Sequence, residues 1–137
     1  MNLTAQWITG FVDGEGCFHI GISNHPEMSG GIQILPEFTV VQHKRDVQVL
    51  FALKAFFNCG VVRTNHGDGM AFRVRKLQHL SEIIIPFFMK HKLKTKRRVD
   101  FEKFRDVVLM MLKKEHLSQE GRAAIMQLAE QMNRKAD

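Results

Sequence analysis

The stretch from Ile8 to Gly16, ITGFVDGEG, constrains the fold of this chain more than any other. Gly10 and Gly14 are four residues apart, so in a helix they share one face, and without a Cβ they allow a second backbone to approach closely. A partner helix is therefore expected on that face. We expect Glu15 to follow just past the last helical turn, where the carbonyl ends of the helix dipole disfavour a carboxylate. This position hints at a bound metal ion.

Hydrophobic periodicity predicts an α+β chain in the order helix, strand, strand, helix, strand, strand, helix, then further helices. Residues 3–13 show helical spacing, whereas residues 17–23 and 33–40 alternate as half-buried strands do. The next elements expected are a helix over 46–57, a hairpin over 61–75 around a glycine-rich turn, a short helix over 77–85 that Pro86 ends, and two further helices. The stripe expected to face the core in the helix over 46–57 is Val47, Leu50, Phe51 and Phe57.

Length and composition indicate one globular domain, residues 1–137, with a polyanionic partner. The chain has 137 residues, is 45% hydrophobic and contains 11 Phe and 8 Met, which is enough to build a core. Lysine and arginine number 20 against 14 acids, for a net charge of +6 and a pI near 9.6. This balance favours nucleic acid ahead of an acidic membrane.

The sequence shows no sign of secretion, of a disulfide framework or of a membrane span. Cys17 and Cys59 are the only cysteines, and they lack the spacing of a zinc site, so we expect two reduced, buried thiols. The longest apolar run, residues 83–89, is interrupted by Pro86 and is too short to cross a bilayer. We therefore expect a soluble intracellular protein, in a bacterial cytoplasm or an organelle, with no membrane partner.

The predicted strands expose polar and basic residues that suit the major groove of DNA. There arginine can read guanine, glutamine or asparagine can read adenine, and an acid can accept from cytosine. The alternative is that these are only solvent-facing strand positions, and that the scattered histidines are only surface or core residues. The DNA-contacting candidates are His19, Ser23, Gln33, Glu37, Thr39, Arg63, Asn65, Arg73 and Arg75.

Glu15 alone is a poor metal site, because Mg²⁺ keeps an octahedral oxygen shell and binds carboxylates together with phosphate and water. The alternative is an ordinary acidic turn over residues 13–16. If the glycine face packs against its own copy across a two-fold axis, two Glu15 side chains converge. We therefore expect a homodimer, with Trp7, Gly10, Phe11 and Gly14 in its interface, that binds Mg²⁺ at Glu15 and Gly14, where Mn²⁺ or Ca²⁺ can substitute in binding.

Two further features could take part in chemistry. The basic run from Lys90 to Arg98 is most simply a solvated helix start or a phosphate patch, but one of its lysines could stabilise charge at a scissile phosphate. Gln42, at a strand-to-helix junction, is most simply a hydrogen-bonded loop residue, but it could also position a nucleophilic water.

Three separated segments, residues 10–16, 38–46 and 86–96, resemble the single-motif LAGLIDADG homing endonucleases. The resemblance implies a helix-hairpin-helix-hairpin-helix core, with a saddle-shaped four-stranded antiparallel sheet and C-terminal helices, in a homodimer. It also implies Mg²⁺-dependent hydrolysis of both strands of a long, pseudo-palindromic DNA site, leaving short 3′ overhangs. Because genes of this family commonly lie in introns, the implied biology is homing of a group I intron.

Position by position, the resemblance implies three catalytic residues. Glu15 matches the metal-binding acid, Gln42 the residue that orders water, and Lys94 the basic residue near the scissile phosphate. Two extra residues after the sequence PFF leave Lys92 or Lys96 possible in place of Lys94, and Lys96 is also a candidate for contact with DNA.

Other matched positions are structural or depart from the family pattern. Asp13 matches a motif acid that is usually structural. Asp46 stands where some relatives have a second basic residue, and Arg45 is the substitute that the sequence offers.

A site-specific endonuclease is the leading function. The alternative is a non-cleaving nucleic-acid binder, either an intron RNA maturase or a regulator of the LAGLIDADG type. A basic α+β module without enzymatic role is a third option, and it predicts a monomer. No protein partner beyond a second copy is implied.

Overall fold

A computed structural model describes residues 1–133 and confirms the predicted order of elements. The first half comprises α1 (Ala5–Glu15), β1 (Gly16–Asn24), β2 (Ile32–His43), α2 (Val47–Phe57), β3 (Val61–Thr64) and β4 (Gly69–Val74). The second half is helical and comprises α3 (Leu77–His79), a π-helical segment (Leu80–Ile84), α4 (Ile85–Lys90), α5 (Lys96–Leu112) and α6 (Gln119–Asn133). Short 3₁₀ turns are Ser29–Gly31, Lys44–Asp46 and Glu115–Leu117.

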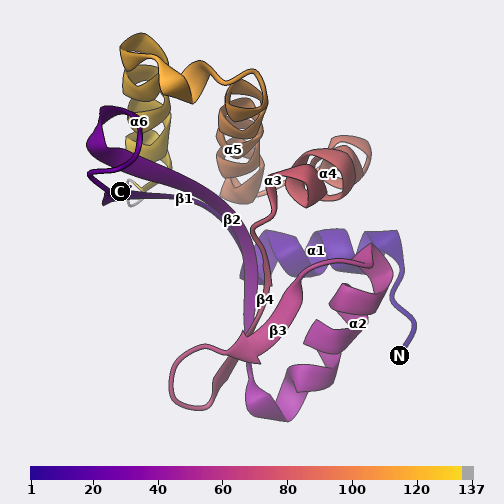
Figure 1. Ribbon diagram of the computed structural model, residues 1–137. Coiled ribbons are helices and arrows are strands. Elements are labelled where there is room, and N and C mark those ends of the chain that lie inside the picture. Colours follow the sequence, from indigo (N-terminus) through magenta and orange to yellow (C-terminus); the bar gives the residue numbers. More distant parts are fainter. Residues whose placement is uncertain (134–137) are drawn as a thin grey trace.

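The strands form one antiparallel four-stranded sheet in the order β1-β2-β4-β3. Figure 1 shows that the sheet is strongly curved, that the helices lie on its convex side, and that no described helix covers its concave side. The fold therefore matches the predicted α+β class with a four-stranded antiparallel sheet. Its concave surface is left open by the described helices (Figure 1).

The alternating strand residues explain which side of the sheet is covered. Phe18, Phe38 and Phe72 point to the helical side and are buried, together with Phe88 of α4 and Phe104 of α5. Their rings meet at centroid distances of 5.0 to 6.3 Å, for example in the pairs Phe18–Phe38 and Phe38–Phe72. This aromatic cluster is the centre of the core, and it leaves the odd-numbered residues of β1 and β2 on the concave side.

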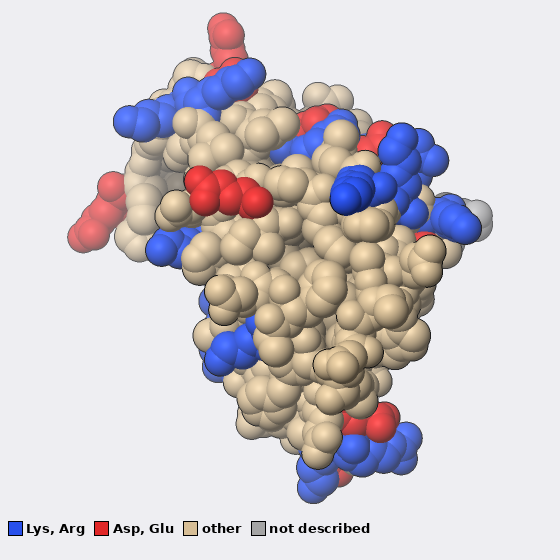
Figure 2. Space-filling view, turned by 90° about the vertical axis from the view of Figure 1, so that its right-hand side faces the viewer, with Lys and Arg blue, Asp and Glu red and all other residues tan. Residues whose placement is uncertain are grey.

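The helical side of the molecule does not present a continuous basic surface. Figure 2 shows a broad central area without charged side chains, with lysine and arginine gathered toward the two ends of the view. Polyanion binding by this central area is therefore not favoured. None of the helices in residues 1–133 is long and apolar enough to cross a membrane.

The first helix ends two residues later than expected. Glu15 is its last residue and does not lie past the last turn, because the N–H of Gly16 still donates to the carbonyl of Val12 although Gly16 itself is extended. The helix begins after a threonine N-cap, because Thr4 Oγ1 accepts from the N–H of Trp7 at 3.1 Å.

The prediction that Pro86 ends a helix over 77–85 is wrong. The helical path continues through the π-helical segment into α4, and Pro86 occupies the first turn of α4. Proline has no N–H to donate, and a π-helical turn changes the hydrogen-bond ladder at the point where the ring must fit. The chain therefore passes Pro86 without leaving the helix.

Two burial predictions are also wrong. Phe51 was expected in the core but is 52% exposed, while Leu53 takes the buried position beside Leu50 and Phe57. Cys17 was expected to be buried but is exposed, because strand alternation puts it on the concave side; Cys59 is buried as expected, and both thiols are free.

Candidate active site and nucleic-acid interface

Asp13 ties the motif helix to the start of α5. Its carboxylate accepts from the backbone N–H of Lys94 at 3.0 Å, from the N–H of Thr95 at 2.9 Å and from Thr95 Oγ1 at 2.8 Å. Thr95 in turn caps α5, because its Oγ1 accepts from the N–H of Arg97 at 3.2 Å. This network fixes the Lys94 backbone against the helix that ends in Glu15.

The electrostatics of Asp13 agree with this structural role. Burial disfavours its charged form, but the hydrogen bonds from Thr95 and Lys94, together with the positive charge of Lys94, outweigh that effect and hold the pKa of Asp13 below its ordinary value. Asp13 is therefore ionised at neutral pH and engaged within the chain, as the resemblance implied for the motif acid.

Glu15 and Gln42 lie at the same end of the sheet. Glu15 is exposed at the junction of α1 and β1, and the next residue, Gly16, pairs with Val40 on β2. Gln42 follows two residues later on β2, and alternation directs it to the helical side, where α1 enters the sheet; its amide donates to the carbonyl of Val41 at 2.9 Å. The pairing thus brings two predicted catalytic residues, far apart in sequence, to one region.

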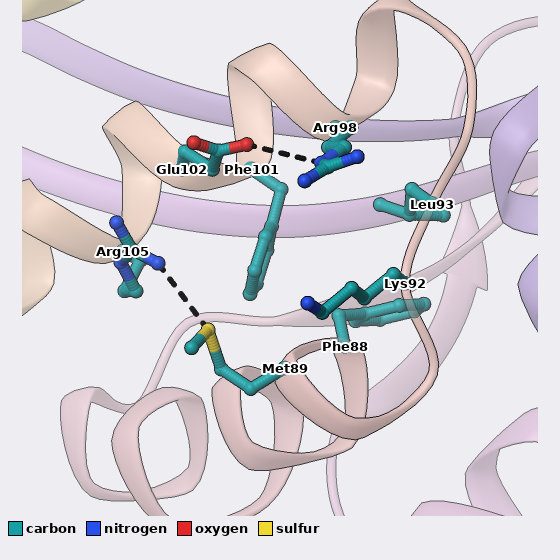
Figure 3. Close-up of a pocket in the computed structure, with 8 residues that line it drawn as sticks. All are labelled: Phe88, Met89, Lys92, Leu93, Arg98, Phe101, Glu102 and Arg105. Carbon is teal, nitrogen blue, oxygen red and sulfur yellow. Dashed lines mark hydrogen bonds and ion pairs between the residues drawn. The ribbon is translucent and has the colours of Figure 1, made fainter.

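The three candidate lysines have different surroundings. Lys96 is already paired, with its Nζ 3.2 Å from a carboxylate oxygen of the buried Asp100. Lys92 lines a cavity of about 130 Å³ between α4 and α5, together with Phe88 and other side chains (Figure 3). Lys94 is exposed, and its backbone is held by Asp13, so among the three it is the lysine most directly placed by the motif helix.

One side of α1 is apolar and uncovered in the single chain. Trp7 is 43% exposed and its ring stacks on that of Phe11 at 4.7 Å. Gly10 and Gly14 are exposed, and a Cβ added to either would meet no other atom within 4 Å. The structure therefore brings together the four predicted interface residues on one side of α1.

The concave face of the sheet carries the predicted DNA contacts in cross-strand rows. Thr39 on β2 lies between Cys17 on β1 and Arg73 on β4, and Arg73 in turn opposes Val61 on β3. Because paired residues of an antiparallel ladder point to the same face, each row presents its side chains together to one partner.

Further rows extend toward the two ends of the sheet. His19 opposes Glu37, and Ser23 opposes Gln33 near the tip of the β1–β2 hairpin. At the other edge Arg63 opposes Ala71, and Asn65 is exposed in the turn that follows β3. All the strand candidates are thus on the concave face. The Lys96 side chain instead forms an ion pair with Asp100.

Two residues of the site region escaped the sequence analysis. Thr95 could have been found, since a threonine directly before a helix is a common N-cap. Asp100 could not, because an acid four residues after Lys96 predicts only an exposed helical pair, whereas the structure buries this carboxylate to 9% exposure.

Comparison with known proteins identifies the family. The family model described as "LAGLIDADG endonuclease" matches residues 8–108, which is well over half of the chain. The chain belongs to the LAGLIDADG endonuclease family. The matched region contains most of α1, the whole sheet, the loop with Lys94 and most of α5, which are the elements that build the site described above.

Several relatives of this LAGLIDADG chain are named as endonucleases. A "Probable intron-encoded endonuclease 2" of Neurospora crassa is 32% identical over 124 residues, which are 90% of this chain but 26% of that protein. The crystal structure of the homing endonuclease I-TnaI superimposes with a TM-score of 0.94 at 52% identity, covering 99% of this chain and 92% of that one.

A third relative was solved with nucleic acid. I-SmaMI, bound to an uncleaved DNA target in the presence of calcium ions, matches with a TM-score of 0.96 at 30% identity, over 99% of this chain and 47% of that chain. The chain thus spans about a quarter of the Neurospora relative and about half of I-SmaMI.

Proposed function

We propose that this chain is a site-specific DNA endonuclease that acts as a homodimer and cuts both strands of a long, pseudo-palindromic site, leaving short 3′ overhangs. The observation that carries this proposal is the Asp13 network, which holds Lys94 against the helix whose last residue is Glu15. The endonuclease names of the relatives and the DNA-bound structure of I-SmaMI support the same conclusion.

The homodimer follows from what one chain lacks. Among residues 1–133 no group of three or more His, Cys, Asp and Glu side chains could hold a metal ion. The exposed Glu15 carboxylate is a hard oxygen ligand of the kind Mg²⁺ prefers, so it fits half of a shared site, with Gly14 beside it. A second copy packed on the open glycine face of α1 would bring in the second Glu15.

The same face supports close packing of two helices. Gly10 and Gly14 leave room for a facing backbone, and the stacked rings of Trp7 and Phe11 would be covered. The match of this chain to about half of I-SmaMI is in keeping with a functional unit of twice this size.

The residues then have separate tasks in phosphodiester hydrolysis. Glu15 of each copy binds the cation, Lys94 stabilises the negative charge that develops on the phosphate, and Gln42 holds the attacking water. When bound, a divalent cation supplies positive charge at the phosphate and lowers the pKa of its water. Mg²⁺ is the proposed ion, with Mn²⁺ or Ca²⁺ as substitutes in binding.

The concave face supplies the recognition surface. The arginines of β3 and β4 and the polar residues of β1 and β2 would lie in the major groove, with other lysines and arginines on phosphates. We further propose a single functional domain over residues 1–137, encoded in an organellar or bacterial genome. The name of the Neurospora relative, an intron-encoded endonuclease, supports a gene that lies within an intron.

Cleavage is tested on DNA that carries the joined exons flanking the host intron, incubated with the protein and Mg²⁺. We expect double-strand cleavage by the wild type, and binding without cleavage by Glu15→Gln and by Lys94→Met. The matched control Lys113→Met, at an exposed lysine after α5, should cut normally. Intact DNA under conditions where the wild type binds it would instead identify a non-cleaving binder.

The dimer is tested independently by sedimentation equilibrium. Gly10→Leu adds a side chain where the single chain has open space, so the fold should persist while self-association weakens and cleavage falls. Ala124→Leu, at an exposed position of α6, is the control and should leave the mass unchanged. A wild-type monomer at working concentration would refute the shared site.

A further inference from the structure

The middle of the concave face contains one acid among several cations. Glu37 on β2 lies opposite His19 on β1, and its side chain is only 20% exposed. One carboxylate oxygen, Oε1, accepts from Thr39 Oγ1 at 2.7 Å, and the other, Oε2, accepts from Arg75 Nε at 2.8 Å. Both oxygens are thus engaged by side chains that themselves face the predicted groove.

The charge state of Glu37 fixes the direction of these hydrogen bonds. Burial disfavours its ionised form, but the hydrogen bonds from Thr39 and Arg75 and the charges of Arg75 and Arg73 outweigh burial and hold the pKa of Glu37 below its ordinary value. An ionised carboxylate only accepts, so the single hydroxyl proton of Thr39 must point to Glu37.

The direction of these hydrogen bonds determines which donors and acceptors Thr39 and Arg75 have left for DNA. The Thr39 hydroxyl donates its hydrogen bond to Glu37, so toward a base it can act only as an acceptor, which suits the amino group of adenine or cytosine. Arg75 has used Nε, so it can reach a base only through its two terminal nitrogens, and that end still matches O6 and N7 of guanine.

We propose that Glu37 is a positioning residue for DNA specificity: it aims Arg75 at a guanine and makes Thr39 an acceptor for the amino group of a neighbouring adenine or cytosine. The inference rests on the proposed function and deepens it, because it assigns Glu37 to setting the preference of two neighbours and not to direct contact with cytosine. The network of Glu37, Thr39 and Arg75, rather than any single side chain, would determine the preference at these two adjacent base pairs.

Glu37 also offsets repulsion among the surrounding guanidinium groups. Burial and the like charges of Arg75 and Arg63 lower the pKa of Arg73, and Glu37 is the neighbour that opposes them. Neutralising Glu37 therefore leaves Arg73 and Arg75 without their shared counter-charge. Sequence-independent contacts to phosphates should then contribute a larger share of the binding affinity, and contacts to bases a smaller share.

The test begins with the wild-type protein and a library of DNA duplexes randomised across the binding site, with Ca²⁺ present so that complexes are not consumed. Sequencing the bound fraction gives the preferred duplex, and single-base variants of it give a preference ratio at each base pair. The same ratios are then measured for Glu37→Gln, Arg75→Lys and the double variant. Glu82→Gln, which removes one exposed acid from the π-helical segment, is the charge-matched control.

We expect Glu37→Gln to lower the preference ratio by about tenfold at a guanine and at its neighbouring base pair, since a good bidentate base contact is of that order. Arg75→Lys should lose the preference for the same guanine, and the double variant should lose no more than Arg75→Lys alone there. Thr39→Val should lose only the neighbouring preference. The control should keep the wild-type profile.

Three results would overturn the inference: an unchanged profile for a folded Glu37→Gln, losses at different base pairs for Glu37→Gln and Arg75→Lys, or fully additive losses in the double variant. If Glu37→Gln does not fold, Arg75→Lys and Thr39→Val still decide, because the inference requires their losses to fall on adjacent base pairs. Failure of the wild type to enrich any duplex would refute the proposed function itself.

Discussion

Replacing Asp13 by alanine is expected to lower the free energy of unfolding by about 2 kcal/mol at neutral pH. The carboxylate accepts from the N–H groups of Lys94 and Thr95 and from the Thr95 hydroxyl, all within 3.0 Å. A hydrogen bond to a charged group contributes about 1.5–3 kcal/mol and the loss of a helix cap costs about 1 kcal/mol, but this site is partly solvated. The expected loss therefore lies slightly below the lower end of their sum, which is about 2.5 kcal/mol.

Asparagine at the same position should be less damaging. It keeps one acceptor oxygen but places an NH₂ group against two N–H donors, so Asp13→Asn should cost about 1 kcal/mol. The comparison separates the charge of Asp13 from its shape. For a chain of this size a loss of 2 kcal/mol corresponds to a fall in melting temperature of about 4–8 °C.

The effect of Asp13 should depend on pH in one direction only. Its pKa is lower in the folded than in the unfolded chain, so its stabilisation is complete above the unfolded value of 3.8 and is lost as the pH falls through the folded value. Urea unfolding followed by circular dichroism should show a constant gap between wild type and Asp13→Ala from about pH 5 to pH 8, and a smaller gap below about pH 4.

The control for this experiment is Asp46→Ala. Asp46 is exposed and its carboxylate lies 3.9 Å from Arg45 Nε, so its loss should change stability by less than about 0.5 kcal/mol. An Asp13→Ala loss as small as that of the control, or a gap that persists unchanged in acid, would refute the account of Asp13 as an ionised acceptor that holds Lys94 and Thr95. Protein concentration must be held constant because any self-association would add to the apparent stability.

Other predictions concern the core, a turn and the motif. Phe104→Ala should cost about 3–5 kcal/mol because the ring is fully buried, whereas Phe51→Ala should cost less than about 1 kcal/mol, as urea midpoints will show. Gly60→Ala should lose about 1–3 kcal/mol in thermal unfolding, since its φ is +85° and the added Cβ would lie 2.6 Å from the ring of Phe72. Glu15→Gln should leave stability unchanged or raise it by up to about 1 kcal/mol, because it removes an anion from a helix C-terminus.

The sequence predicted what depends on local periodicity. Alternation over residues 17–23 and 33–40 placed β1 and β2 and assigned their concave faces, and the Gly- and Asn-rich turn at 65–69 placed the second hairpin. It did not reveal the strand order, in which β2 pairs with β4. The reason is physical: alternation specifies which face of a strand is buried, but it does not specify the neighbouring strand.

The incorrect and absent predictions also arise because local pattern does not specify tertiary neighbours. Phe51 reads as a core residue by its type, and only the placement of α2 on the sheet shows that Leu53 is buried in its place. Likewise the bond between Glu37 and Arg75 joins residues 38 positions apart, and it exists only because β2 and β4 are neighbours. Interactions that depend on tertiary pairing cannot be inferred from local pattern.

The two acids of the opening motif show how tertiary contacts separate tasks that the sequence leaves ambiguous. Asp13 accepts hydrogen bonds from three donors of Lys94 and Thr95, directly before α5. Its charge therefore stabilises the fold and positions Lys94. Glu15, two residues later, ends α1 exposed, where the helix dipole disfavours an anion. A carboxylate that destabilises its own helix persists most readily where a cation compensates it, so the unfavourable position of Glu15 favours a catalytic rather than a structural role for this residue.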